Sequence, residues 1–180
     1  MTLKDLLTYL KADLLRLAPT NPSFFSLMTH SLHPRFFPVF FVRVSRYFYC
    51  HKLFRFLSPV FTWFNVIIFG IEVTPKCDIG PGLMLPHTFG TVIGANKIGP
   101  NATIFQGSTI GASSLDIGFD INKRPVIGCH LIVGAGAKVL GDLTLGDNVT
   151  IGANSVVIKS VADAMVVAGI PAKIIGRNRC

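Results

Sequence analysis

The sequence has few acidic residues and no cysteine spacing typical of a metal site. Nine Asp and Glu residues stand against 17 Lys and Arg in 180 residues, so the formal net charge is +8. The four cysteines form no CxxC pair, and the start of the chain lacks the apolar core and small-residue cleavage site of a secretory leader. We therefore expect a cytoplasmic protein with reduced thiols and no bound metal.

A long uninterrupted apolar run is also missing. The most apolar stretch, residues 60–71, contains Thr62, Asn65 and Gly70, and it is shorter than the ~20 residues that a membrane-spanning helix requires. Half of the residues are nevertheless hydrophobic, and the mean hydropathy is +0.54. Lipid or partner subunits are therefore expected to cover part of the apolar surface.

Basic charge gathers in residues 1–70, which hold eight basic and two acidic residues, a net charge of +6. Twelve of the 15 Phe residues lie there too, whereas a nucleic-acid-binding arm would carry Gly, Ser and Asn between its charges. Helical spacing predicts helices over residues 2–17, where Thr2 and Asp5 resemble a capping pair, and over residues 39–57. We expect this α-helical region to contact other subunits or the inner surface of a membrane, and no nucleic acid.

A period of six residues begins at residue 73. An apolar residue recurs at every sixth position, and a small or apolar residue stands two positions before most of these anchors. The anchors are Val73, Ile79, Leu85, Val92, Ile98, Ile104, Ile110, Ile127, Val133, Val139, Leu145, Ile151 and Val157. The preceding inward positions are Cys77, Ala102, Ser108, Leu131, Ala137, Leu143, Val149 and Ser155. Three hexapeptides predict one triangular coil, and about five stacked coils predict a left-handed parallel β-helix.

The repeat divides the chain into parts. Residues 71–162 are the predicted β-helix, residues 1–70 the helical region and residues 163–180 a capping tail. The gap after Ile110 leaves eleven extra residues, so residues 112–125 are expected to protrude as a loop at one corner of the coil. The expected fold is therefore mainly β, a left-handed parallel β-helix with an N-terminal α-helical region.

Four motifs resemble the serine acetyltransferase branch of the hexapeptide acyltransferases, and especially its relatives in capsule and exopolysaccharide gene clusters. They are GIEVTPKCDIGPGLMLPHTFGTVIG, IFQGSTIGA, RPVIGCHLIVGAGAKVLGDLTLGDNVTIGANSVV and VAGIPAKIIG. The resemblance implies an enzyme that transfers an acetyl group from acetyl-CoA to a hydroxyl group. It also implies a homotrimer in which coenzyme and acceptor meet in the clefts between neighbouring subunits.

The resemblance also implies roles for particular residues. His87 would remove the proton of the acceptor hydroxyl, and Glu72, fifteen positions earlier, would orient it. A carboxylate beside an imidazole makes it a stronger base, which attack on a thioester requires. The implied coenzyme contacts are Ala112, Ser113, Ala135, Ala153, Lys159, Lys173 and Arg177, and the implied acceptor contacts are Pro86, Gln106, Lys123 and Arg124.

The departures from the family pattern bear on the acceptor. In serine acetyltransferases an Asp that binds the ammonium group of serine precedes the catalytic His, whereas this chain has Pro86 there. Lys123 and Arg124 align with the pair that binds the carboxylate of serine. Because the ammonium partner is missing, we expect the acceptor to be a sugar hydroxyl of a capsular, exopolysaccharide or lipopolysaccharide precursor, free or lipid-linked, at the inner face of the bacterial membrane.

Other hypotheses stay open. A serine O-acetyltransferase of cysteine biosynthesis would use the same catalytic His, and turnover of free L-serine would reveal it. A zinc γ-carbonic anhydrase on the same scaffold needs three converging His, but only His87 and His130 lie in the repeats. A scaffold subunit without chemistry would have no reason to keep Glu72 and His87 at their spacing.

Overall fold

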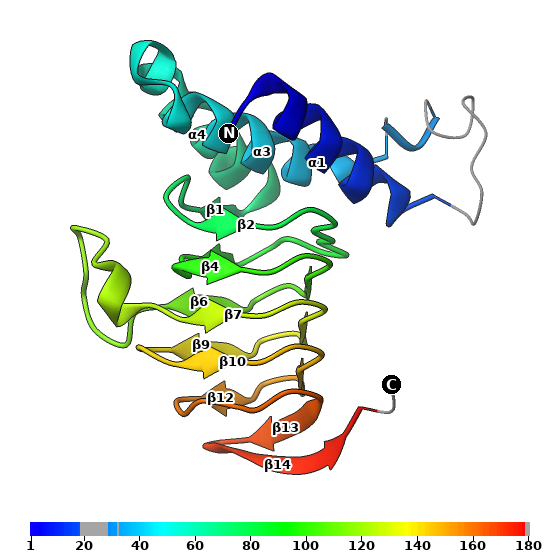
Figure 1. Ribbon diagram of the computed structural model, residues 1–180, viewed down its shortest axis with the longest axis vertical. Helices are drawn as coiled ribbons and strands as arrows, with labels where there is room; N and C mark the ends of the chain where they lie inside the picture. Colours follow the sequence, from blue (N-terminus) through cyan, green and yellow to red (C-terminus); the bar gives the residue numbers. More distant parts are fainter. Residues whose placement is uncertain (19–28, 32, 179–180) are drawn as a thin grey trace.

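A helical cap covers one end of a stack of parallel strands, and a terminal hairpin lies at the other end (Figure 1). The computed structural model describes residues 1–18, 29–31 and 33–178. The cap contains α1 (Leu3–Leu15), α3 (Phe36–Cys50), η1 (Lys52–Leu57) and α4 (Ser58–Phe69). Helix α1 confirms the helix predicted over residues 2–17. Its capping pair is present, since Thr2 N donates to Asp5 Oδ2 at 2.7 Å and Asp5 N donates to Thr2 Oγ1 at 3.2 Å.

The second predicted helix differs from the structure at both ends. Helix α3 begins at Phe36, before the predicted start at residue 39. Pro38 fits in the first turn of this helix, because the N–H groups of a first turn have no partner within the helix and the N–H that proline lacks costs no hydrogen bond. The helix ends at Cys50, because the backbone of His51 is extended, with φ −102° and ψ 108°. The apolar stretch that follows forms α4, whose left-handed C-cap at Gly70 (φ 61°) turns the chain into the first strand.

Parallel strands form three walls of the stack. Wall A contains β1 (Ile71–Val73), β3 (Thr91–Ile93), β6 (Thr109–Gly111), β9 (Lys138–Leu140) and β12 (Val156–Val157). Wall B contains β2 (Asp78–Ile79), β4 (Lys97–Ile98), β7 (Val126–Ile127) and β10 (Thr144–Leu145). Wall C contains β5 (Thr103–Ile104), β8 (Ile132–Val133), β11 (Thr150–Ile151) and the antiparallel hairpin of β13 (Met165–Gly169) and β14 (Ala172–Arg177). The chain visits the walls in turn, so each coil pairs in parallel with the coil before it, as a six-residue repeat predicts.

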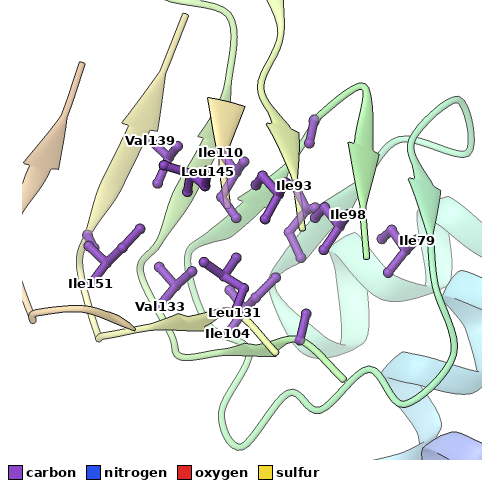
Figure 2. Close-up of a cluster of buried hydrophobic side chains, with 14 of the residues drawn as sticks. Ile79, Ile93, Ile98, Ile104, Ile110, Leu131, Val133, Val139, Leu145 and Ile151 are labelled. Carbon is purple, nitrogen blue, oxygen red and sulfur yellow. The ribbon is translucent and has the colours of Figure 1, made fainter. Parts of the chain in front are cut away.

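The repeat positions fill the interior of the stack (Figure 2). Ile98, Ile104, Ile110 and Val133 are completely buried, and all the predicted positions that precede the anchors are buried too. Burial raises the pKa of the Cys77 thiol to about 12, so this cysteine stays protonated inside the core.

One predicted anchor is wrong. Val92 is only partly buried, and Ile93 occupies the inward position with 1% of its surface exposed. The reason is the length of the turn after Leu85, which shifts the register of the next strand by one residue. Val73 therefore pairs with Ile93, and Ile93 pairs with Ile110.

A buried ion pair joins the helical cap to the first coil. Arg43 of α3 donates to both carboxylate oxygens of Asp13 in α1, at 2.7 and 2.9 Å. The same guanidinium donates to the carbonyl oxygens of Ile79 and Gly80, and Asp13 Oδ1 accepts the N–H of Leu83 at 2.8 Å. Because every group in this network has a partner, it fixes the position of the cap on the β-structure.

Candidate active site

Turns of successive coils stack along the edge between walls C and A. Backbone hydrogen bonds of 2.8–3.0 Å link Gly107 N to Phe89 O, Gly136 N to Gln106 O, and Asn154 N to Ala135 O. Close stacking requires glycine at Gly136, where φ is +73° and an added Cβ would lie 2.1 Å from Asn154 Oδ1. The stacked turns bring His87, Gln106, Ala135 and Ala153 to one edge of the molecule.

His87 lines a hollow of about 560 Å³ between this edge and the helical cap. The cap contributes Arg35 and Phe69, and the stacked turns contribute His87, Phe89 and Gln106. The imidazole is exposed, whereas the side-chain oxygen of Gln106 is buried and has no hydrogen-bond partner among the described residues. A base and a cationic side chain thus line a space that suits a small polar molecule with a hydroxyl group.

Sequence reasoning missed Arg35 and Phe69. Both belong to the cap, and no repeat or motif marks them, because only the docking of the cap brings them to the turn that carries His87. Pro86 also lines this hollow, but its ring offers no hydrogen-bond donor or charge.

Glu72 lies on the outer face of wall A, where it is exposed. It lines a second hollow of about 560 Å³, together with Ala112 and Arg124. Within the described chain no hydrogen bond or ion pair joins Glu72 to His87. Their pairing therefore stays a prediction.

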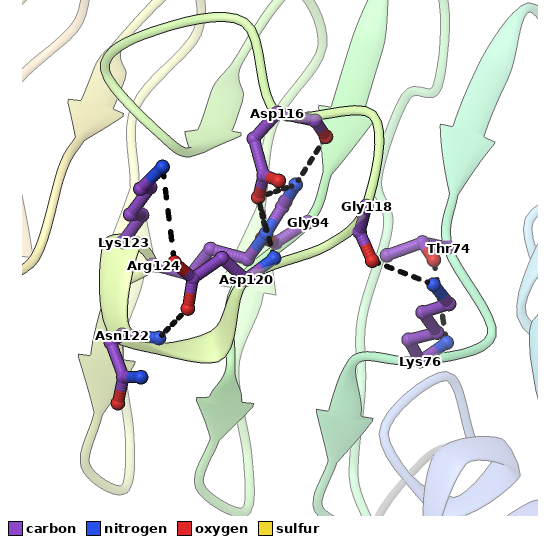
Figure 3. A network of polar contacts seen from close by, with 9 residues as sticks. All are labelled: Thr74, Lys76, Gly94, Asp116, Gly118, Asp120, Asn122, Lys123 and Arg124. Atoms are coloured by element: carbon purple, nitrogen blue, oxygen red, sulfur yellow. Dashed lines mark hydrogen bonds and ion pairs between the residues drawn. The ribbon is translucent and has the colours of Figure 1, made fainter.

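The loop over residues 112–125 protrudes from the edge between walls A and B, and Arg124 holds its base (Figure 3). Arg124 donates to Asp116 Oδ2 from Nε at 3.0 Å and from Nη2 at 2.8 Å, and to the Gly94 oxygen at 2.7 Å. Its guanidinium carbon also lies 3.9 Å from the centre of the Phe119 ring. These contacts occupy Arg124 inside its own chain, so its predicted contact with an acceptor stays a prediction.

Lys123 has a different environment in the same loop. Its ammonium nitrogen lies 3.8 Å from Asp120 Oδ2, and the side chains of Lys123 and Asp120 are 56% and 41% exposed. An exposed pair at this distance contributes little to stability. Lys123 is therefore free to meet a ligand, and its predicted acceptor contact also stays a prediction.

Replacing Arg124 with alanine is expected to loosen the loop without unfolding the coils, because the contacts to Asp116 and Gly94 would be lost. We expect faster amide hydrogen exchange over residues 112–125 and little change in global unfolding. Lys123→Ala is the matched control, with exchange unchanged. Unaltered loop exchange in Arg124→Ala would show that Arg124 does not anchor the loop.

The same loop should respond to acid. Burial of Asp116 raises its carboxyl pKa, but hydrogen bonds from Arg124 and from the Asp120 N–H outweigh burial, so the pKa lies below its ordinary value. A lowered pKa in the folded state stabilises the loop above the ordinary carboxyl pKa, and this stabilisation is lost as pH falls through the lowered value.

The residues predicted to contact the coenzyme lie along both edges of wall A and on β14. Ala135 and Ala153 lie on the edge with His87, whereas Ala112, Ser113 and Lys159 follow wall A at its other edge. Lys159 and Lys173 line one hollow of about 300 Å³, where two ammonium groups suit a phosphate. Arg177 is exposed at the end of β14. Among the described residues no cluster of three or more potential metal ligands occurs.

Comparison with known proteins shows which enzymes this arrangement resembles. Residues 124–159 match the family model described as bacterial transferase hexapeptide (six repeats). A serine acetyltransferase of Staphylococcus xylosus is 44% identical over 129 residues, which are 71% of this chain and 56% of that protein. The crystal structure of a serine acetyltransferase from Neisseria gonorrhoeae gives a TM-score of 0.85 at 28% identity, covering 99% of this chain and 69% of that chain.

The chain is therefore similar to hexapeptide-repeat acetyltransferases. Another similar structure, the serine acetyltransferase of Brucella abortus strain S19 in complex with coenzyme A, gives a TM-score of 0.79 at 26% identity, covering 99% of this chain and 70% of that chain. This hexapeptide-repeat chain spans little more than half the length of the curated relatives that it matches.

These relatives correct the predicted acceptor. Relatives at 37–44% identity are serine acetyltransferases, so the prediction of a capsule or exopolysaccharide enzyme with a glycan or lipid-linked acceptor is wrong. The error came from Pro86, because the loss of one ammonium partner does not show that another acceptor replaces serine. The relatives also give no support for the expected membrane contact.

Proposed function

We propose that this chain is an acetyl-CoA-dependent serine O-acetyltransferase built on a left-handed parallel β-helix, with His87 as its catalytic base. The observation that carries the proposal is the hollow beneath the cap, in which an exposed imidazole faces a space for a small acceptor. The imidazole takes the proton of the serine hydroxyl while the oxygen attacks the thioester carbonyl carbon. A C–O bond forms and the C–S bond breaks, and the imidazolium returns the proton to the departing thiolate of coenzyme A.

Recognition of serine in the absence of the family Asp needs other groups. The guanidinium of Arg35 is suited to the carboxylate of serine, and the side chain of Gln106 lies in the wall of the same hollow. Pro86 then shapes the wall beside His87 without binding either charge.

The coenzyme site is proposed to form between copies of the chain. Wall A separates the edge of Ala135 and Ala153 from the edge of Ala112 and Ser113, so one protomer does not bring all four around a single cleft. In a homotrimer the first edge of one copy would face the second edge of its neighbour. The pantetheine arm would lie between these small side chains, with phosphates near Lys159, Lys173 and Arg177.

Thiol release from acetyl-CoA tests the proposed reaction. We expect turnover with L-serine, and loss of turnover with ethanolamine, which lacks the carboxylate, and with 3-hydroxypropionate, which lacks the ammonium group. Absence of thiol release with saturating L-serine would overturn the proposal.

The proposed acceptor contact of Arg35 has its own test. Loss of a charge-assisted hydrogen bond costs ~1.5–3 kcal/mol, so Arg35→Ala should raise the KM for serine by roughly 10- to 100-fold while the KM for acetyl-CoA stays unchanged. Lys52→Ala removes an exposed cation elsewhere on the cap and serves as the control. An unchanged KM for serine in Arg35→Ala would remove Arg35 from the site.

A further inference from the structure

The outer face of η1 and α4 is an apolar surface that no described part of the chain covers. Leu53, Phe56, Trp63 and Ile67 expose 76, 71, 66 and 70% of their surface. Phe54, Val60, Phe64 and Ile68 are exposed as well. Soluble monomers rarely expose contiguous apolar patches larger than a few hundred Å², so this face, at the end of the molecule opposite the hairpin (Figure 1), is expected to have a partner.

The apolar side chains are neighbours on one helix face. Val60, Trp63, Phe64 and Ile67 line a shallow apolar hollow of about 360 Å³ together with Pro59. Their spacing of three and four residues places them on the same side of α4. The surface is therefore continuous, and not a set of isolated exposed residues.

Positive charge borders this apolar face. No acidic residue stands between Asp13 and Glu72. Lys52 and Arg55 on η1 are exposed, and among the described residues neither has an ion-pair partner. The Arg55 guanidinium carbon lies 4.8 Å from the centre of the Tyr49 ring, which holds this charge beside the apolar side chains. Exposed aromatics next to unpaired cations are typical of surfaces that bind anionic lipids.

The packing of α4 against α3 bears on whether this face could cross a membrane or only bind its surface. Lys52–Phe69 is long and apolar enough to cross a bilayer by length and composition. However, Asn65 Nδ2 donates to the Pro38 oxygen at 3.1 Å, and Ser45 Oγ donates to the Ser58 oxygen at 3.0 Å, so the inner face of α4 is tied to α3. A helix that crossed the bilayer would have to break these contacts with α3.

We propose that the outer face of η1 and α4 binds the surface of an anionic phospholipid bilayer without crossing it. Trp63 and Ile67 would enter the boundary between headgroups and acyl chains, and Lys52 and Arg55 would contact headgroup phosphates. A second copy of the chain is the competing occupant, but a twofold contact through this face would bring Lys52 and Arg55 of both copies together, and residues 52–69 contain no acidic residue to balance them. The proposed acetyl transfer does not depend on this contact.

Vesicle flotation of the full chain tests the proposal. We expect binding to phosphatidylcholine vesicles that contain phosphatidylglycerol, and binding about tenfold weaker to vesicles of phosphatidylcholine alone or at high salt. Trp63 is the sole tryptophan of the chain, so its fluorescence should shift to the blue on binding. Binding that does not depend on lipid charge and salt concentration, or Trp63 fluorescence that does not shift on binding, would overturn the proposal.

Variants separate the membrane from a second copy. Lys52→Gln and Arg55→Gln should each weaken binding to anionic vesicles by about fivefold, and Ile67→Ser should weaken it further. Leu115→Ser, in the protruding loop, is the control, because Leu115 is exposed (87%) but lies outside the patch, and its binding should be unchanged. A different result would overturn the proposal: the wild-type chain does not bind anionic vesicles, and Ile67→Ser dissociates an oligomer of the chain. That result would assign the outer face of η1 and α4 to a second copy.

Discussion

Replacing His87 with alanine is expected to lower kcat/KM for acetyl transfer to L-serine by about 10²–10⁴-fold, the range that a general base contributes. His87 is the imidazole in the hollow beneath the cap, which Arg35 and Gln106 also line. Without it, the serine hydroxyl would have to attack the thioester while still protonated or lose its proton to water. Thiol release measured at several serine concentrations separates this loss of kcat from a loss of binding.

The control for this prediction is the other histidine of the repeats. His130 is exposed and has a φ of 57°, a conformation that Asn tolerates, so His130→Asn should leave kcat/KM unchanged. Glu72→Gln tests the predicted role of Glu72 in positioning His87. We expect this variant to have a lower kcat, an unchanged KM for acetyl-CoA and an altered pH profile of activity. Wild-type activity in His87→Ala would refute the assignment of the base, whatever the acceptor is.

Replacing Asp13 with alanine is expected to reduce the free energy of unfolding by about 3–5 kcal/mol, the cost of leaving a buried charge without its partner. The side chains of Arg43 and Asp13 are 3% and 0% exposed. In the variant the Arg43 guanidinium would stay buried without a counter-charge, and the N–H of Leu83 would lose its acceptor. Chemical denaturation followed by circular dichroism measures the loss.

Two further variants isolate the cause of this loss. Removing both charges with Asp13→Leu and Arg43→Met should be less destabilising than Asp13→Ala, because no charge is left unpaired. Asp5→Ala removes an exposed cap of the same helix, and its effect should be clearly smaller. If Asp13→Ala unfolds at the same denaturant concentration as wild type, the buried pair does not hold the cap.

The identity of the acceptor was predicted wrongly from the sequence. Pro86 stands where the resemblance implies an Asp that binds the ammonium group of serine, and the inference from this difference to a sugar acceptor was wrong. A missing group says nothing about a substitute supplied from elsewhere in the chain. The structure brings Arg35 of the cap into the same hollow as His87 and Gln106, a meeting that the spacing of the motifs could not predict.

The sequence by itself determined the stacked coils, the first helix and the position of the loop, because these depend on local periodicity and on caps within a few residues. Only the tertiary structure decided that Ile93 and not Val92 points inward, since a distorted turn sets the register of that strand. The Arg43–Asp13 pair and the meeting of Arg35 with His87 were likewise decided by tertiary structure. These contacts join residues far apart in the chain, and their positions follow from how the cap packs on the first coil, which no six-residue repeat encodes.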